Sequence, residues 1–265
     1  MKHKILIIAG SDPSGGAGIQ ADIKTATALK TYSSCVISCL TAQNTAKVYD
    51  VFYPPISFLE KQILAVFDDI KFDAVKIGML GNLEITKSVA KILQEKTKSS
   101  VNNLKIITDP VMVATSGDKL LKDDAISVLK KELISISYLV TPNTDEAEIL
   151  ADMKIRNLND VKIAAAKIQK LGAKNVLIKG GHLNLGDKIH NYLLMHDGRD
   201  KIFTNKKLPY NKIHGTGCTL ATAISSFVAQ GIDLEDAIKK ANLFVLKAIK
   251  NGKNIGHGSR ILQHF

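Results

Sequence analysis

The sequence predicts an α/β fold of three layers, in which helices cover both faces of a mostly parallel β-sheet. Short apolar runs, typical of buried strands, alternate along the chain with longer segments that carry apolar residues at helical spacing. Each apolar run ends at a glycine or a polar residue, as strands do before a loop. Because the 265 residues contain no linker-like stretch and no internal repeat, we predict a single domain over 1–265.

The strands and helices are expected in a regular order. Apolar runs predict strands over 4–9, 36–40, 74–77, 104–108, 138–141 and 175–179. Apolar residues three and four apart predict helices over 19–29, 58–70, 85–93 and 161–171, then one that follows Gly217 and ends at Gly231, and a last one from about Leu234. One passage departs from this alternation: segments 189–196 and 200–204 flank Asp197-Gly198-Arg199 and predict a small antiparallel hairpin.

The composition favours a globular protein with a lysine-rich surface. The net charge is +11, but only three of the 36 basic residues are arginines and there is no tryptophan. Arginine is the residue that contacts phosphate and guanine bidentately, so we expect a surface that attracts anionic small molecules and no nucleic-acid partner. No apolar run approaches the roughly 20 residues that span a bilayer, so no membrane partner is expected.

The cysteines indicate a reducing compartment. There are three, Cys35, Cys39 and Cys218, and an odd, sparse count argues against a disulfide framework. No targeting segment is apparent at the N-terminus. We therefore expect a cytoplasmic protein, in which Cys35 and Cys39 pack within a strand.

Residues suited to binding follow the predicted strands at their carboxyl ends. Ligands of open parallel sheets bind at this edge. The residues placed there are Gly10, Ser11, Gln43, Met79, Asp109, Asn143, Gly180 and Gly181. We therefore expect them to converge on one site.

The turn Gly215-Thr216-Gly217-Cys218, where a helix begins, is a candidate phosphate site. Its glycines leave backbone N–H groups accessible, and a helix N-terminus binds anions, although a tight turn that needs only glycine flexibility explains the same pattern. The Gly-Lys-Ser/Thr ending of a P-loop is absent. Cys218 begins the helix, where a lowered thiol pKa is expected, so it is a candidate base or nucleophile, or else a small packing residue.

Two further polar side chains are candidates for binding an organic substrate. Gln43 offers an amide donor and acceptor, which suits the edge of a heterocycle. Asp22, on the first helix, is a second polar candidate. For both, ordinary hydrogen bonding within the protein is the alternative.

Two carboxylates and a lysine are candidates for the phosphate and its metal. Asp109 and Glu146 suit Mg²⁺ and its waters, although Glu146 equally suits the first turn of a helix capped by Thr144. Lys179 ends an apolar strand, where it either neutralises phosphate charge or extends past a buried stem to solvent.

Seven motifs, taken in order, resemble those of a known family. They are Ala9-Gly-Ser-Asp-Pro-Ser-Gly-Gly-Ala-Gly-Ile-Gln-Ala-Asp22, Thr41-Ala-Gln-Asn-Thr45, Lys76-Ile-Gly-Met-Leu80, Asp109-Pro-Val-Met112, Thr141-Pro-Asn143, Lys179-Gly-Gly-His182 and His214-Gly-Thr-Gly-Cys-Thr219. Together they closely resemble the hydroxymethylpyrimidine/phosphomethylpyrimidine kinases of thiamine biosynthesis, which have a ribokinase-like fold. The resemblance covers nearly the whole chain.

The resemblance implies two ATP-dependent steps and a role for each candidate residue. The first step phosphorylates 4-amino-5-hydroxymethyl-2-methylpyrimidine, and the second converts the monophosphate to the pyrophosphate. The implied roles are Gln43 on the pyrimidine edge; Asp22, Ala17, Met79 and Val111 lining the same pocket; Gly215 and Gly217 as the anion hole; Lys179 on phosphate charge; Asn143, Lys179 and Gly217 on ATP; and Asp109 and Glu146 organising Mg²⁺. Cys218 stands where many ribokinase-like enzymes place an aspartate base. A homodimer is also implied.

Three other functions remain as alternatives. Pyridoxine or pyridoxal kinase is the nearest, because its substrate is also a nitrogen heterocycle with a hydroxymethyl group. A cysteine hydrolase built on Cys218 needs His214 as its base. A basic nucleic-acid-binding protein is the third.

Overall fold

The computed structural model describes residues 2–99, 104–112, 121, 123–180, 188–210 and 212–265, so Gly181 and His182 of the predicted motif lie outside the described residues. The strands are β1 (Lys4–Ser11), β2 (Tyr32–Gln43), β3 (Val48–Phe52), β4 (Ala74–Ile77), β5 (Lys105–Thr108), β6 (Leu139–Val140), β7 (Asn175–Ile178), β8 (Lys188–Leu194), β9 (Asp200–Lys206), β10 (Ile213–His214) and β11 (Arg260–Ile261). The helices are α1 (Gly18–Ala28), α2 (Ile56–Asp69), α3 (Leu83–Ser99), α4 (Asp123–Val128), α5 (Thr144–Ala151), α6 (Leu158–Gln169), α7 (Thr216–Ala229) and α8 (Leu234–Asn251).

A nine-stranded sheet runs through the molecule in the order β3-β2-β1-β4-β5-β6-β7-β8-β9. The six strands from β2 to β7 in this order are parallel to one another. Antiparallel strands complete both sides: β3 beside β2, and the predicted hairpin β8–β9 beside β7. The predicted α/β architecture is therefore confirmed, with its parallel strands at the centre.

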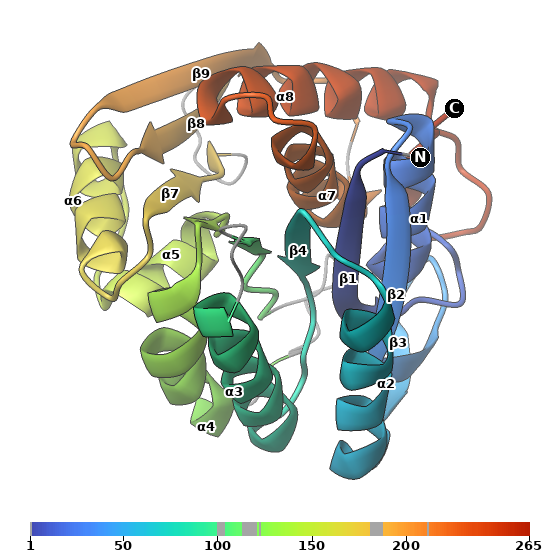
Figure 1. The fold of residues 1–265 in the computed structure, drawn as a ribbon. Helices are drawn as coiled ribbons and strands as arrows, with labels where there is room; N and C mark the ends of the chain where they lie inside the picture. The colour runs from blue at the N-terminus through green and yellow to red at the C-terminus, as the bar shows by residue number, and fades with distance from the viewer. Residues whose placement is uncertain (1, 100–103, 113–120, 122, 181–187, 211) are drawn as a thin grey trace.

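Alternating side chains of the central strands fill two cores. On β1, Leu6 and Ile8 face the core shared with α2 to α6, whereas Ile5 and Ile7 face the core shared with α1, α7 and α8. Figure 1 shows these helices in layers on opposite sides of the sheet. Because strand side chains alternate between faces, strands buried on both faces are apolar at nearly every position.

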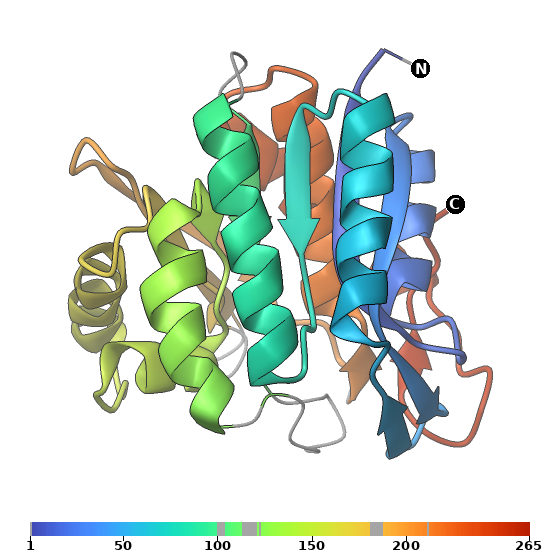
Figure 2. The ribbon, with the colours of Figure 1, turned by 60° about the horizontal axis from the view of Figure 1, so that its bottom comes forward.

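The structure contains elements that the apolar pattern does not predict. β2 is longer than 36–40 and continues into an antiparallel ribbon with β3, in which Leu40 pairs with Phe52. This ribbon projects beyond the helices (Figure 2) and has little buried surface, so its side chains carry no continuous apolar signal. The segment 123–136 passes from α-helix through a π turn to a 3₁₀ turn, so no single 3.6-residue stripe spans it.

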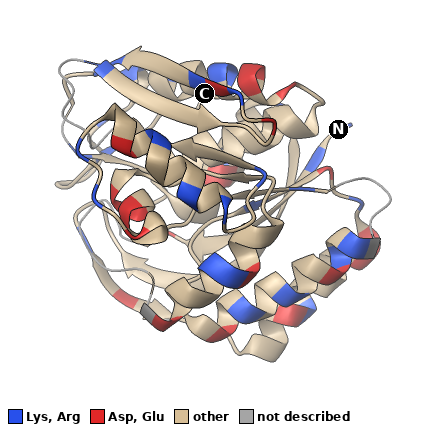
Figure 3. Cartoon of the chain, turned by 90° about the vertical axis from the view of Figure 1, so that its left-hand side faces the viewer, with Lys and Arg blue, Asp and Glu red and all other residues tan. Residues whose placement is uncertain are grey.

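Charges of both signs are interspersed over the helices. On the side drawn in Figure 3, basic residues are interspersed with acidic ones and do not gather into one patch. Among the described residues, no helix is long and apolar enough to cross a membrane.

Candidate functional site

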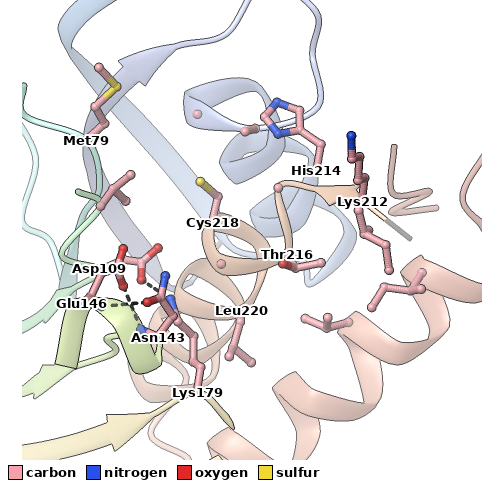
Figure 4. A pocket seen from close by; sticks show the side chains of 18 of the residues that line it. Met79, Asp109, Asn143, Glu146, Lys179, Lys212, His214, Thr216, Cys218 and Leu220 are labelled. Atoms are coloured by element: carbon pink, nitrogen blue, oxygen red, sulfur yellow. Dashed lines mark hydrogen bonds and ion pairs between the residues drawn. The ribbon is translucent and has the colours of Figure 1, made fainter. Parts of the chain in front are cut away.

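The carboxyl ends of the parallel strands open into a cavity of about 690 Å³. The predicted site residues that line it are Ala17, Gln43, Met79, Asp109, Val111, Asn143, Glu146, Lys179, Gly215, Gly217 and Cys218. In Figure 4, Cys218 lies between Met79 on one side and the group of Asp109, Glu146, Asn143 and Lys179 on the other. The tertiary fold thus brings together nearly all the residues that the sequence places at strand ends.

The first turn of α7 forms the floor of the cavity. Gly215 caps this helix with a φ of 83°, and a Cβ atom there would lie 1.9 Å from the carbonyl oxygen of Gly16. Both the left-handed backbone and this close approach require glycine. The first N–H groups of a helix have no partner within the helix, so the α7 N-terminus presents donors and a partial positive charge to the cavity.

A largely buried ion pair stands opposite the α7 N-terminus. Lys179 Nζ donates to Asp109 Oδ1 at 2.7 Å, and the Thr141 hydroxyl donates to the same oxygen at 2.9 Å. A Cβ atom on Gly217 would lie 3.2 Å from Asp109 Oδ2 and 3.3 Å from Lys179 Nζ. The lack of a side chain at Gly217 therefore keeps open the space between the helix N-terminus and this pair.

Glu146 and Asn143 form a capping box at the start of α5. The Asn143 side chain accepts from the Glu146 N–H at 2.9 Å, and Glu146 Oε2 accepts from the Asn143 N–H at 2.7 Å. Glu146 Oε1 faces the Met112 N–H at 3.4 Å. Burial raises the pKa of Glu146 to about 7, against the opposing effect of Lys179. The helix-start interpretation of Glu146 is confirmed, with Asn143 and not Thr144 as the cap.

The carboxylates suit a hydrated Mg²⁺ that arrives with phosphate, and not a cage built by the protein. Both oxygens of Glu146 face backbone N–H groups, and Asp109 Oδ1 is held by Lys179 and Thr141. Asp109 Oδ2 accepts no hydrogen bond among the described residues, and it faces the open space at Gly217. Within the described ranges no three His, Cys, Asp or Glu side chains gather as a metal cluster. Mg²⁺ commonly binds through one or two carboxylates and substrate phosphates.

Cys218 lines the cavity as a half-buried free thiol. Burial raises the pKa of Cys218 to about 11; Lys76 lowers it, Asp22 and Asp109 raise it further, and a hydrogen bond from the Gly18 N–H lowers it. The expectation of a lowered thiol pKa is therefore wrong, because burial among carboxylates outweighs the position at a helix N-terminus. A Cys218–His214 hydrogen bond is not among those of the described residues; His214 instead contacts Asp12 and Gln43.

The expectation that Asp22 lines the substrate pocket is also wrong. Its carboxylate is fully buried, and it accepts from Lys76 Nζ and from the Thr222 hydroxyl, both at 2.7 Å. Lys76 is equally buried on β4, and although burial opposes it, Asp22 and Cys218 raise the pKa of this lysine. The pair packs beneath the cavity, where it ties α1, β4 and α7 together.

We expect Lys76→Met to destabilise the fold strongly. It leaves the buried Asp22 carboxylate without its cation, and breaking such a pair costs about 3–5 kcal/mol. Urea denaturation measures the loss. Lys154→Met is the control, because its ion pair with Glu148 leaves 76% of the lysine side chain exposed and such pairs contribute little. Adding Asp22→Asn to Lys76→Met removes the unpaired charge, so it should restore part of the lost stability. If the double variant is no more stable than Lys76→Met, the ion-pair explanation is contradicted.

Sequence reasoning missed several residues that shape the cavity. Thr41 contacts Gln43, Asp12 is linked to Gln43 through His214, and Asn191 of β8 and Asn242 of α8 also line the cavity. Asn191 and Asn242 are joined by a 3.0 Å hydrogen bond. Asn242 lies on a helix far from any strand end, so no local signal marks it. Asp12 stands in a glycine-rich loop that follows a strand, and that position was the available signal.

Comparison with known proteins identifies close relatives. The family model described as phosphomethylpyrimidine kinase matches residues 12–263. A hydroxymethylpyrimidine/phosphomethylpyrimidine kinase of Bacillus subtilis is 42% identical over 266 residues, which cover 99% of this chain and 95% of that protein. A thiamine biosynthesis bifunctional protein of Geobacter sulfurreducens is also 42% identical over 99% of this chain, and the chain spans about half (52%) of its length.

A solved structure shares the fold at lower identity. The pyridoxal kinase of Staphylococcus aureus, in complex with AMP-PCP and pyridoxal, superposes with a TM-score of 0.88 at 32% identity. The match covers 100% of this chain and 94% of that one.

Proposed function

This chain belongs to the phosphomethylpyrimidine kinase family, and from this premise we propose that it transfers phosphoryl groups from ATP to 4-amino-5-hydroxymethyl-2-methylpyrimidine and then to the resulting monophosphate. The observation that carries the proposal is the open space at Gly217, which lies between a helix N-terminus and the Lys179–Asp109 pair. The anion-binding N–H groups of the α7 N-terminus border this space on one side, and the Lys179 ammonium borders it on the other. Phosphoryl transfer needs little besides such positioning and charge stabilisation.

Each end of the cavity suits one substrate. Gln43, Met79, Val111 and Ala17 surround the end nearer α1, where a small heterocycle is proposed to bind. Leu208, Ile213, Val245 and Ile249 line the end beside α8, which suits the apolar faces of a nucleotide base. The α7 N-terminus stands between the two ends, so the transferred group passes over Gly217.

Lys179 and the α7 backbone are proposed to hold the transferring phosphoryl group. The Lys179 ammonium, already oriented by Asp109, neutralises charge on the phosphate oxygens, and the N–H groups at Gly217 and Cys218 donate to them. Asn143 is proposed to contact ATP from the start of α5. Mg²⁺, when bound, neutralises phosphate charge as a Lewis acid; Asp109 would hold its waters, and Glu146 would act indirectly, by fixing the start of α5 and the backbone at Met112.

Cys218 is proposed to receive the proton of the hydroxymethyl group. With a pKa of about 11 the thiol is ionised in only a small fraction of molecules near neutral pH, and that fraction is a strong base. The second acceptor is a phosphate, which is already anionic. The proton acceptor is therefore needed chiefly in the first step.

A coupled ATPase assay with each alcohol tests the proposal. We expect saturable turnover with the aminopyrimidine alcohol and with its monophosphate. Pyridoxal kinase is the second candidate, because the S. aureus pyridoxal kinase has nearly the same fold. Turnover with pyridoxal alone would overturn the first proposal in favour of the second.

Gln43→Ala is expected to raise the KM for the aminopyrimidine about tenfold, the effect of losing one or two hydrogen bonds to the ring. The KM for ATP should stay unchanged, because Gln43 ends β2 and is not among the apolar residues proposed to hold the nucleotide base. Steady-state kinetics with each substrate varied in turn measure both constants. An unchanged pyrimidine KM would reject the assignment.

Three broader features are proposed on the same basis. One continuous sheet with cores on both faces supports a single domain over 1–265. Leu40, Tyr49 and Phe52 are largely exposed on the β2–β3 ribbon, which supports a homodimer formed through this ribbon. Free thiols at all three cysteines agree with a cytoplasmic location, which stays a prediction.

A further inference from the structure

A chain of hydrogen bonds links Gln43 to a buried carboxylate through His214. His214 Nε2 lies 2.9 Å from Asp12 Oδ2 and 3.2 Å from Gln43 Nε2. The other end of the Gln43 amide, Oε1, lies 3.1 Å from the Thr41 hydroxyl, which donates to the Ser11 carbonyl at 3.0 Å. Nothing in the kinase mechanism above uses Asp12 or His214.

Asp12 is held as an ionised acceptor. Its Oδ1 accepts from the N–H and the hydroxyl of Ser14, and its Oδ2 accepts from the N–H groups of Ala17 at 2.8 Å and Gly16 at 3.2 Å. Burial opposes ionisation, but the hydrogen bonds from His214 and Ser14 prevail and lower the pKa of Asp12. An ionised carboxylate only accepts, so the hydrogen between Asp12 and His214 is on His214 Nε2.

His214 is held in place by its backbone and at one edge of its ring. Its backbone lies in β10, where His214 pairs with Ile261 of β11. Its ring lies against Gly16, where a Cβ atom would come within 2.5 Å of His214 Cδ2. These contacts hold the ring with Nε2 directed at Asp12 and Gln43.

The proton on His214 determines how the Gln43 amide is turned. A protonated Nε2 cannot accept from the Gln43 NH₂ group, and two donors at 3.2 Å would repel. A half-turn of the amide exchanges two nearly isosteric groups, and it places the oxygen against His214 and the NH₂ against Thr41. Thr41 can accept, because its own hydrogen goes to Ser11.

We propose that the Asp12–His214 pair is a positioning device that sets the donor and acceptor order of Gln43 and thereby the preference for an aminopyrimidine. This inference rests on the proposed function. The Gln43 oxygen then accepts one hydrogen bond from His214, and its NH₂ group donates one to Thr41. The amide therefore keeps one acceptor and one donor site that face the cavity. A ring nitrogen beside an exocyclic amino group complements that edge, whereas pyridoxine has no such adjacent pair.

Substitution of His214 tests the device. We expect His214→Phe to raise the KM for the aminopyrimidine alcohol about tenfold, the effect of one misplaced hydrogen-bond pair. The KM for ATP should stay the same, and the preference for aminopyrimidine over pyridoxine should fall by a similar factor. His214→Gln keeps an N–H donor at the Nε2 position and should recover most of the preference. His196→Phe, at an exposed position in the β8–β9 turn, is the matched control.

Any of several results would overturn the inference. An equal rise in KM for both alcohols, or no recovery in His214→Gln, would indicate only a structural role for His214. If His214→Phe does not fold, Thr41→Val takes its place, since it removes the acceptor for the Gln43 NH₂; an unchanged preference would then count against the device. ¹⁵N NMR of wild-type protein should show a proton on His214 Nε2, and its absence would overturn the inference.

These readouts separate the inference from the function on which it rests. If wild-type protein phosphorylates neither alcohol, the proposed function fails, while the NMR result still reports on the Asp12–His214 pair. If wild-type protein turns over the aminopyrimidine with kinetics that His214→Phe does not alter, the function stands and the inference fails.

Discussion

Cys218→Ala should slow the first phosphorylation about 100-fold or more, the usual contribution of a positioned general base, with little change in the second. The alcohol must lose a proton to become a phosphate ester, and Cys218 is the ionisable side chain at the α7 N-terminus beside the cavity. The monophosphate acceptor is already anionic, so the second step does not need the thiolate. Single-turnover assays started with the alcohol or with the monophosphate separate the two rates.

The pH dependence follows from the raised pKa of Cys218. Because the thiol has a pKa of about 11, the thiolate fraction rises tenfold per pH unit between pH 7 and 9. The rate of the first step should rise in proportion over this window, and the second step should not. Cys218→Asp, whose carboxyl group ionises at a lower pH than a thiol in the same place, should retain activity with a weaker pH dependence in this window.

The half-buried thiol of Cys35, on β2 and outside the cavity, provides the control. Cys35→Ala should leave both steps unchanged. Equal losses of both steps in Cys218→Ala would refute the base assignment, and so would a first-step pH profile that survives the substitution.

Gly217→Ala should give a stable protein in which both phosphorylation steps are strongly slowed. Gly217 lies in the first turn of α7 and outside the left-handed region, so alanine suits its backbone. The added methyl would lie 3.2 Å from Asp109 Oδ2 and 3.3 Å from Lys179 Nζ, in the space assigned to the transferring phosphoryl group. A displacement of about 1 Å at a reacting centre can cost about 100-fold, so kcat/KM should fall by about this factor for both acceptors.

Gly198→Ala is the control, and it should lower stability without lowering activity. Gly198 has a φ of 85° in the β8–β9 turn, and no atom lies within 4 Å of its added Cβ. Alanine there should cost about 1–2 kcal/mol of stability through the left-handed backbone and leave both steps intact. Thermal denaturation and the two assays measure these effects. Full activity of Gly217→Ala would place the transfer elsewhere, and a loss confined to the first step would assign Gly217 to the alcohol alone.

Gly217 and Cys218 differ in what the local sequence pattern could predict about them. Glycine at 217 and the helix that follows it are visible in the sequence, and the structure keeps both as the floor of the cavity. The pKa of Cys218 is set by burial and by Lys76, Asp22 and Asp109, which come from β4, α1 and the end of β5. Charges that converge from distant segments leave no local signal, so the expected lowering of this pKa was wrong.

By itself the sequence determined the alternation of strands and helices, the antiparallel hairpin and the set of residues at strand ends, because side-chain periodicity and chain punctuation are local properties. Only the tertiary structure decided which polar residues face the cavity and which are buried beneath it in contacts with other protein groups. Asp22 and Gln43 are both polar candidates in the sequence, yet Asp22 is buried against Lys76, whereas Gln43 reaches the cavity beside His214. That division depends on the packing of α1 and α7 against the sheet, which brings together residues about 200 positions apart in the chain.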